Sequence, residues 1–213
     1  MIDKDGEAER GCEPASRAEA RRQKLLDTAR ALFIERGFHN TGIAQIARDS
    51  GVLVGQIYRD FASKEDIIAA IVRRDLEAFL HEGTLGEAIA RSDTQAVREW
   101  IINFIDDQKP REDCQIIVDI MAESPRAERI AQIFQSVRAD VQRSMSKALE
   151  VLAPAPEITA RREALVDAIM AISLGVVQHR LANPTFDTAE LKETLHRIIQ
   201  RELDALIEAS NAC

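Results

Sequence analysis

Residues 41–61 read TGIAQIARDSGVLVGQIYRDF, and the spacing of small and apolar residues within this stretch decides the fold. Two short helices joined by a tight turn need a small residue where they cross, a turn residue able to adopt a positive φ, and apolar anchors on each helix. Ala47, Gly51 and Ile57 stand at these places. Further anchors are Ile43, Ile46 and Val52. The stretch predicts a helix-turn-helix, although helix pairs in ordinary cores also carry an Ala and a Gly.

The remainder of the chain predicts further helices. After Ser16, apolar residues recur at intervals of three and four, and the alternation typical of strands is absent, so we expect an all-α fold. Gly37 fits a left-handed helix end, and Ser63 with Asp66 fits a capping box. The predicted helices cover residues 17–36, 42–50, 52–59, 63–80, 94–109, 113–122, 125–152, 156–181 and 188–209. We expect residues 1–16 to form a disordered tail.

The charge of the chain is unevenly distributed. The net charge of -8 would oppose binding to a polyanion if it were spread evenly. Residues 17–64, however, carry nine Lys or Arg against five Asp or Glu, whereas residues 65–213 carry seventeen against twenty-six. A basic face can therefore form near the N-terminus.

The composition also indicates a compartment. The longest apolar stretches, such as residues 168–177, are shorter than the ~20 residues that span a bilayer, so no membrane association is expected. Cys12, Cys114 and Cys213 are scattered and form no CxxC pair, as suits a reducing compartment. We expect a cytoplasmic protein.

No catalytic constellation is visible in the sequence. The chain has no HExxH, GxSxG, GxGxxG or Walker motif. Its histidines are widely separated, at His39, His81, His179 and His196. We therefore expect no enzyme activity, no catalytic or metal-binding residue and no cofactor.

Four segments carry a resemblance to a known family. They are KLLDTARALF at residues 24–33, RGFHNT at 36–41, IARDSGV at 46–52 and GQIYRDFASKE at 55–65. Their identity and spacing resemble the signature of TetR/AcrR transcriptional regulators over about residues 20–70. The resemblance implies a helix-turn-helix DNA-binding domain over 17–62, an effector-binding and dimerisation domain over 63–213, and about nine helices in total.

The resemblance also implies which residues meet an operator in double-stranded DNA. Thr41 is expected to cap the second helix and meet a phosphate, and Tyr58 and Lys64 to clamp the backbone. Val54 and Gln56 are expected to meet base edges, and Gly55 to permit close approach. The full predicted set is Thr41, Ala44, Val54, Gly55, Gln56, Tyr58, Arg59 and Lys64.

Two alternatives and two departures accompany this set. Tyr58 and Phe61 could be core aromatics, a reading that we favour for Phe61. Arg17 and Arg21 could reach a minor groove from a mobile arm, although a solvated helix face is the commoner role. Leu53 stands where the family commonly has a small hydroxyl residue. Asp60 stands where it commonly has His or an aromatic, and we expect Asp60 to pair with Arg59 or with a basic side chain of the first helix.

Regulators of this family bind palindromic operators as dimers, which requires a second, self-complementary surface. Residues 156–181 carry a stripe of small residues, and residues 188–209 carry an apolar stripe. We therefore predict a homodimer whose interface contains Ala168, Ala171, Gly175, Leu195 and Ile199. Alternatively, parts of both stripes pack inside one subunit.

A small-molecule effector is expected between the middle helices. Aromatic and Met residues there suit a lipophilic ligand, although each of them, taken alone, fits the core better than a pocket lining. The predicted lining is Trp100, Phe104, Met121, Phe134 and Met170. Acidic residues that could instead favour a cationic ligand are Asp106, Asp107, Asp119 and Glu123. The predicted function is a repressor released from its operator by the effector; the alternative is a helical small-molecule or protein-binding module with impaired DNA binding.

Overall fold

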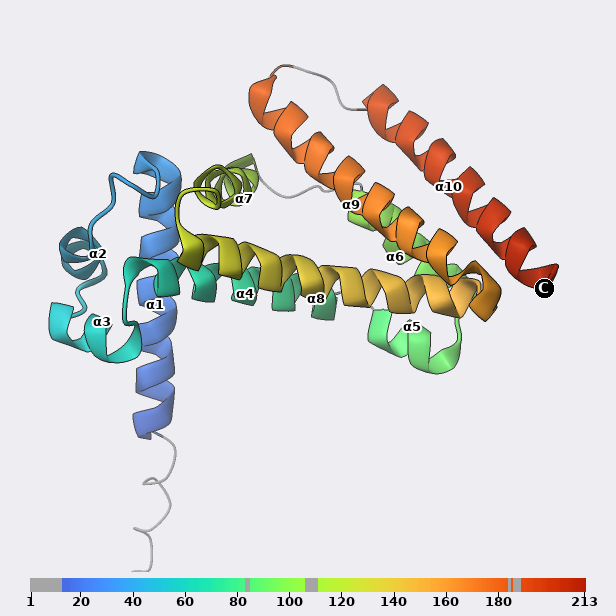
Figure 1. Ribbon diagram of the computed structural model, residues 1–213. Helices are drawn as coiled ribbons and strands as arrows, with labels where there is room; N and C mark the ends of the chain where they lie inside the picture. The colour runs from blue at the N-terminus through green and yellow to red at the C-terminus, as the bar shows by residue number, and fades with distance from the viewer. Residues whose placement is uncertain (1–12, 83–84, 106–110, 184, 186–188) are drawn as a thin grey trace, which may run out of the picture. The chain divides into compact units, whose positions relative to one another are not determined.

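The computed structural model describes residues 13–82, 85–105, 111–183, 185 and 189–213, and all the regular secondary structure within them is helical (Figure 1). The elements are α1 (Glu13–Arg36), α2 (Ile43–Ser50), α3 (Val54–Asp60), α4 (Lys64–Glu82), α5 (Leu85–Arg91), α6 (Thr94–Ile105), α7 (Arg111–Glu123), α8 (Glu128–Leu152), the 3-10 helix η1 (Pro156–Ile158), α9 (Thr159–Ala182) and α10 (Ala189–Asn211). The predicted all-α fold is confirmed. The described residues form ten α-helices rather than about nine.

Several helix ends differ from the prediction. Helix α1 begins at Glu13, so residues 13–16 are helical rather than part of a disordered tail; Pro14 is compatible with the first turn because its missing N–H has no partner there. Residues 1–12 lie outside the described residues, as do residues 106–110 at the predicted end of α6.

Helix α5 is the element that the sequence analysis missed. Leu85 and Ala88 are buried in the core, and Glu87 pairs with Arg91 one turn later at 3.3 Å. A seven-residue helix has fewer than two turns, which is too short to show a clear periodicity or to be stable alone. Packing against the neighbouring helices α6 and α8 stabilises it.

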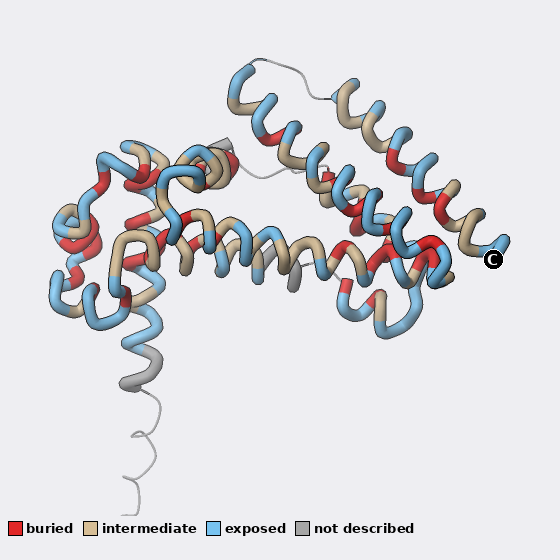
Figure 2. The backbone as a smooth tube through the Cα atoms, in the orientation of Figure 1, coloured by how far each residue is buried: buried red, intermediate tan, exposed pale blue. Residues whose placement is uncertain are grey.

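The described chain divides into two compact units between Ile71 and Val72, within α4, whereas the boundary expected from the sequence lay between residues 62 and 63. In the first unit, α2 packs on α1 and on α3 (Figure 2). Its buried side chains are Leu25, Leu26, Ala29, Leu32, Phe33, Phe38, Ile46, Ala47, Val52, Ile57, Phe61, Ile67, Ile68 and Ile71. Burial of each large apolar side chain contributes about 1.5–3 kcal/mol, which stabilises two helices too short to persist alone.

The second unit has its own core, contributed by α5, α6, α8, α9, α10 and the turn before α9. Arg162 of α9 is buried, and its guanidinium lies against the end of α8. It donates to the Ala153 carbonyl at 2.6 Å, the Ala155 carbonyl at 2.7 Å and the Thr159 hydroxyl at 2.9 Å. The bond to Ala153 satisfies the C-cap carbonyl of α8, which the helix leaves without an intrahelical partner, and the bond to Ala155 ties α9 to the turn before it.

Candidate nucleic-acid interface

The turn between α2 and α3 is fixed by local hydrogen bonds and by Gly51. Gly51 ends α2 with φ +71°, in the left-handed region that the sequence predicted for it. The Ser50 hydroxyl donates to the Ala47 carbonyl and accepts from the Val52 amide, both at 3.3 Å. Ile46, Ala47, Val52 and Ile57 are buried where α2 and α3 meet the first unit's core, so these predicted anchors are confirmed, whereas Ile43 is only half-buried.

One side of α3 remains open to solvent. Tyr58 is 54% exposed and Val54 is 41% exposed, and a Cβ built on Gly55 would meet nothing within 4 Å. Gln56 is half-buried, while Arg59 is exposed, as is Ala44 on α2. The alternative that Tyr58 is a core aromatic is wrong. Phe61 is buried, with the Arg22 guanidinium 4.7 Å from its ring centroid, so the core interpretation of Phe61 is confirmed.

Thr41 does not have the predicted capping role. Its side chain is 1% exposed, and its hydroxyl faces the Leu32 carbonyl at 3.2 Å and the Gly37 carbonyl at 3.0 Å. Gly42 is the N-cap of α2, and it makes no side-chain cap. The Thr41 hydroxyl therefore ties the segment before α2 to the end of α1 and is not offered to a phosphate.

Lys64 connects the start of α4 to the α1–α2 loop. Its Nζ donates to the Phe38 carbonyl at 2.6 Å and to the His39 carbonyl at 3.5 Å, and it lies 4.3 Å from the Phe38 ring centroid. The Ser63 hydroxyl accepts from the Asp66 amide at 3.2 Å, as the capping box predicted. These contacts fix the Lys64 side chain against the α1–α2 loop.

Asp60 pairs with two arginines, as expected from the sequence. Its carboxylate lies 3.8 Å from Arg21 on α1 and 3.7 Å from Arg59. Arg17 and Arg21 both lie within the regular helix α1, as the predicted helix over residues 17–36 implies, so the alternative of a mobile arm does not apply. The three groups of these ion pairs together carry one net positive charge. Asp60 nevertheless holds both guanidinium groups and so offsets part of the positive charge beside α3.

The predicted dimer residues divide into two groups. Ala168, Ala171 and Gly175 are exposed on the side of α9 opposite its buried residues. On α10, Leu195 is half-buried against the core, and Ile199 is only 1% exposed. Ile199 therefore packs inside the subunit, and the neighbouring Ile198 is the exposed large apolar side chain.

The predicted effector residues lie within the packing of the second unit. Trp100 belongs to the core, Phe104 and Met170 pack against it, and the Trp100 and Phe104 ring centroids are 6.0 Å apart. Met121 on α7 and Phe134 on α8 are half-buried outside this cluster. The structure brings together three of the five residues. Asp106 and Asp107 lie outside the described residues, whereas Asp119 and Glu123 are half-buried on α7.

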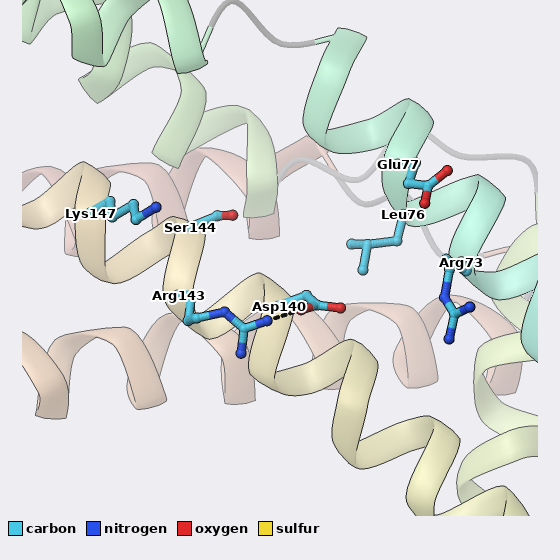
Figure 3. A pocket seen from close by; sticks show the side chains of 7 residues that line it. All are labelled: Arg73, Leu76, Glu77, Asp140, Arg143, Ser144 and Lys147. Atoms are coloured by element: carbon cyan, nitrogen blue, oxygen red, sulfur yellow. Dashed lines mark hydrogen bonds and ion pairs between the residues drawn. The ribbon is translucent and has the colours of Figure 1, made fainter.

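Two grooves of the second unit were not foreseen. One, of about 260 Å³, lies between α4 and α8 and is lined largely by charged groups, including an Asp140–Arg143 ion pair (Figure 3). Its lining is Arg73, Leu76, Glu77, Asp140, Arg143, Ser144 and Lys147. The other, of about 230 Å³, lies between α9 and α10 and is lined by Arg161, Ala164, Leu165, Ala168, Glu202 and Leu206. Neither groove contains a predicted effector residue.

The segment Pro156–Ala182 is long and apolar enough to cross a membrane by length and composition alone. This is weak evidence, because core helices of soluble proteins pass the same test. Only 28% of its most apolar window is buried within the chain, so part of this apolar surface is left uncovered.

A short helix pair with a left-handed turn, an open second helix and a separate helical unit define a helix-turn-helix regulatory architecture. Residues 25–71 match the family model for bacterial regulatory proteins of the tetR family, and residues 90–204 match the model for the BetI-type transcriptional repressor C-terminal region. The chain therefore belongs to the TetR family, whose members named among its relatives are transcriptional regulators rather than enzymes.

Individual relatives agree with this family. The HTH-type transcriptional repressor KstR2 of Mycobacterium tuberculosis is 40% identical over 63 residues, which are 30% of this chain and 32% of KstR2. The match thus spans about a third of the length of that relative. GusR of Salmonella enterica has a TM-score of 0.64 at 21% identity, covering 92% of this chain and 100% of GusR. A regulator of Saccharomonospora viridis, solved with choline, has a TM-score of 0.65 at 19% identity, covering 86% and 96%. At these identities the structural likeness shows the fold.

Proposed function

We propose that the protein is a ligand-responsive, DNA-binding transcriptional regulator that acts in the cytoplasm as a repressor. The observation that carries this proposal is the open side of α3, where Val54, Gly55 and Tyr58 project from a helix whose other side is anchored by Ile57. A rigid exposed helix of this kind can enter the major groove.

The proposed contacts divide by type. Val54, Gly55 and Gln56 meet base edges, with Ala44 beside them on α2. Tyr58, Arg59 and Lys64 meet the phosphate backbone, which positions α3 without reading sequence. The Thr41 backbone amide remains a candidate phosphate donor, since the hydroxyl is engaged within the protein.

The test is binding of the purified protein to the DNA that flanks its own gene, measured by fluorescence anisotropy at two salt concentrations. Tyr58→Ala is expected to weaken binding to all sequences, and Gln56→Ala to change sequence preference. Binding that weakens with salt supports the proposal, because phosphate contacts release counterions. A folded dimer that binds no duplex would favour a helical binding module without DNA-binding activity, as Leu53 and Asp60 would then have disabled α3.

The proposed active species is a homodimer that meets a palindromic operator. The exposed stripe of Ala168, Ala171 and Gly175 on α9 permits close approach of a partner helix, and α10 contributes the half-buried Leu195 and the exposed Ile198. Pairing would cover the apolar surface of α9 that the single chain leaves open, which accounts for that surface without a membrane.

The proposed effector is a small, lipophilic molecule that enters the second unit beside Trp100, Phe104 and Met170; Met121 and Phe134, half-buried outside that cluster, are the remaining proposed contacts. A cationic effector is the second candidate, because Asp119 and Glu123 lie half-buried on α7 and the similar Saccharomonospora protein was solved with choline. Effector binding would shift the population toward a dimer whose α3 helices no longer fit successive major grooves.

Trp100 is the only tryptophan of the chain, so its fluorescence reports on this region directly. Titration with a medium-chain fatty acid tests the lipophilic effector, and titration with choline tests the cationic one. A saturable change in emission, accompanied by release of bound DNA, identifies the class. A change in emission without release would show a ligand that does not discriminate between the two states.

A further inference from the structure

Exposed apolar side chains gather in one short segment of the first unit. Four large apolar side chains are exposed among the described residues, and three of them lie within residues 53–58. Leu53, at 71%, is the most exposed of the four, ahead of Tyr58 and Val54. The fourth, Ile198, belongs to the second unit. Because exposed apolar surface is unfavourable in water, this clustering marks a contact surface rather than chance exposure.

The backbone of Leu53 is firmly held although its side chain is free. Leu53 has φ −63° and ψ 139°, an extended conformation directly before α3. Its carbonyl accepts from the Gln56 amide at 2.9 Å and from the Ile57 amide at 3.1 Å, and Ile57 is fully buried. The side chain therefore projects from a fixed backbone position. A side chain held in this way loses less conformational entropy on binding than one in a flexible loop, which suits recognition of a partner.

The chemistry of Leu53 restricts what it can recognise on DNA. A leucine side chain neither donates nor accepts a hydrogen bond, so it cannot hold a phosphate or pair with a polar base edge. The major groove presents one apolar group, the C5-methyl of thymine. We propose that Leu53 and Val54 contact thymine methyl groups. Leu53 is then a residue that determines the sequence specificity of DNA binding. This inference rests on the proposed DNA binding by α3.

Replacement of thymine by deoxyuridine tests the contact, because it removes the methyl group and keeps every hydrogen-bonding atom. The duplex is first selected from a random pool by the wild-type protein, and each thymine is then replaced in turn. Loss of a contacted methyl is expected to weaken binding about three- to fivefold at one or two positions in each half-site.

Variants at position 53 assign the effect to the side chain. Leu53→Ser is expected to lose the difference between thymine and deoxyuridine at the position that Leu53 contacts and to keep any difference at a position that Val54 contacts, whereas Leu53→Met, which remains apolar, is expected to retain both. Because Leu53 is exposed, Leu53→Met is expected to unfold at the same temperature as the wild type, whereas Leu53→Ser, which can cap the N-terminus of α3, is expected to unfold at the same or a higher temperature.

The outcomes distinguish failure of the thymine contact from failure of the proposed DNA binding. If the wild-type protein retains no duplex, the proposed function and this inference fail together. If it binds a selected duplex in a salt-dependent way but deoxyuridine changes nothing at any position, only the inference fails. The inference also fails if Leu53→Ser keeps the full sensitivity to the methyl group.

Discussion

Asp60 is the single residue whose charge most directly opposes the proposed function. Its carboxylate lies beside Arg21 and Arg59, so it neutralises cations near α3 and repels phosphates. Asp60→Asn is expected to tighten duplex binding about three- to tenfold at low salt, with the gain shrinking as salt screens the charge. Glu87→Gln, which breaks an exposed ion pair on α5, is the matched control and should leave affinity unchanged. Weaker binding by Asp60→Asn would mean that the carboxylate positions Arg59 for its contact.

Two glycines on either side of Leu53 have opposite requirements, and alanine distinguishes them. Gly51→Ala forces a side chain into the left-handed region at φ +71° and is expected to lower the free energy of unfolding by about 1–2 kcal/mol. Gly55→Ala lies in α3 with no atom near its new Cβ, and it is expected to raise that free energy by about 0.5–1 kcal/mol while weakening DNA binding. Urea denaturation and anisotropy measure the two effects. Unchanged DNA affinity in Gly55→Ala would remove Gly55 from the interface.

At the scale of the element, local patterns could be predicted and contacts distant in sequence could not. Helices α2 and α3 follow from the spacing of Ala47, Gly51 and Ile57, because each of these roles is set by immediate neighbours. The role of Thr41 could not be predicted, since its position suits a helix cap equally well. Its actual partners, the Gly37 and Leu32 carbonyls, lie four and nine residues earlier, and the contact with Leu32 depends on how the segment after α1 folds back on that helix. Helix α5 was missed for the same reason, because packing rather than periodicity stabilises it.

The end of α8 offers a test of such a packed element. Arg162→Met removes the donors to the Ala153 and Ala155 carbonyls and is expected to lower the free energy of unfolding by about 1–3 kcal/mol, because the buried Ala153 carbonyl loses its donor, whereas the half-buried Ala155 carbonyl still accepts from the Ile158 amide. Arg126→Met changes an exposed arginine in the turn before α8 and is expected to alter stability by less than about 0.5 kcal/mol. Equal effects of the two substitutions in urea denaturation would show that the buried guanidinium contributes little.

For the whole molecule, the sequence indicated two units, but it did not indicate which apolar residues are buried within each unit and which stay exposed. Ile198 and Ile199 are neighbours on the apolar stripe of α10, and only the packing of α10 on the core determines that Ile199 is buried and Ile198 exposed. The effector residues illustrate the same limit. Trp100, Phe104 and Met170 were recognised as apolar, yet the pattern could not separate core from ligand lining.

The dimer belongs to this scale as well. Ala171→Glu places a charge in the exposed stripe of α9 and is expected to shift the protein from dimer to monomer in sedimentation velocity, with loss of operator affinity. Ala122→Glu adds the same charge at an exposed position of α7 and should leave the dimer intact. A dimer that persists in Ala171→Glu would place the interface on another face.

The most direct test of a dimeric, DNA-reading helix-turn-helix protein is a footprint of the wild-type chain on its selected duplex. The account predicts two protected half-sites, related as an inverted repeat and centred one helical turn or a multiple of about 10–10.5 base pairs apart, with both lost together in Tyr58→Ala. A single protected half-site, or no protection on any selected duplex, would contradict it.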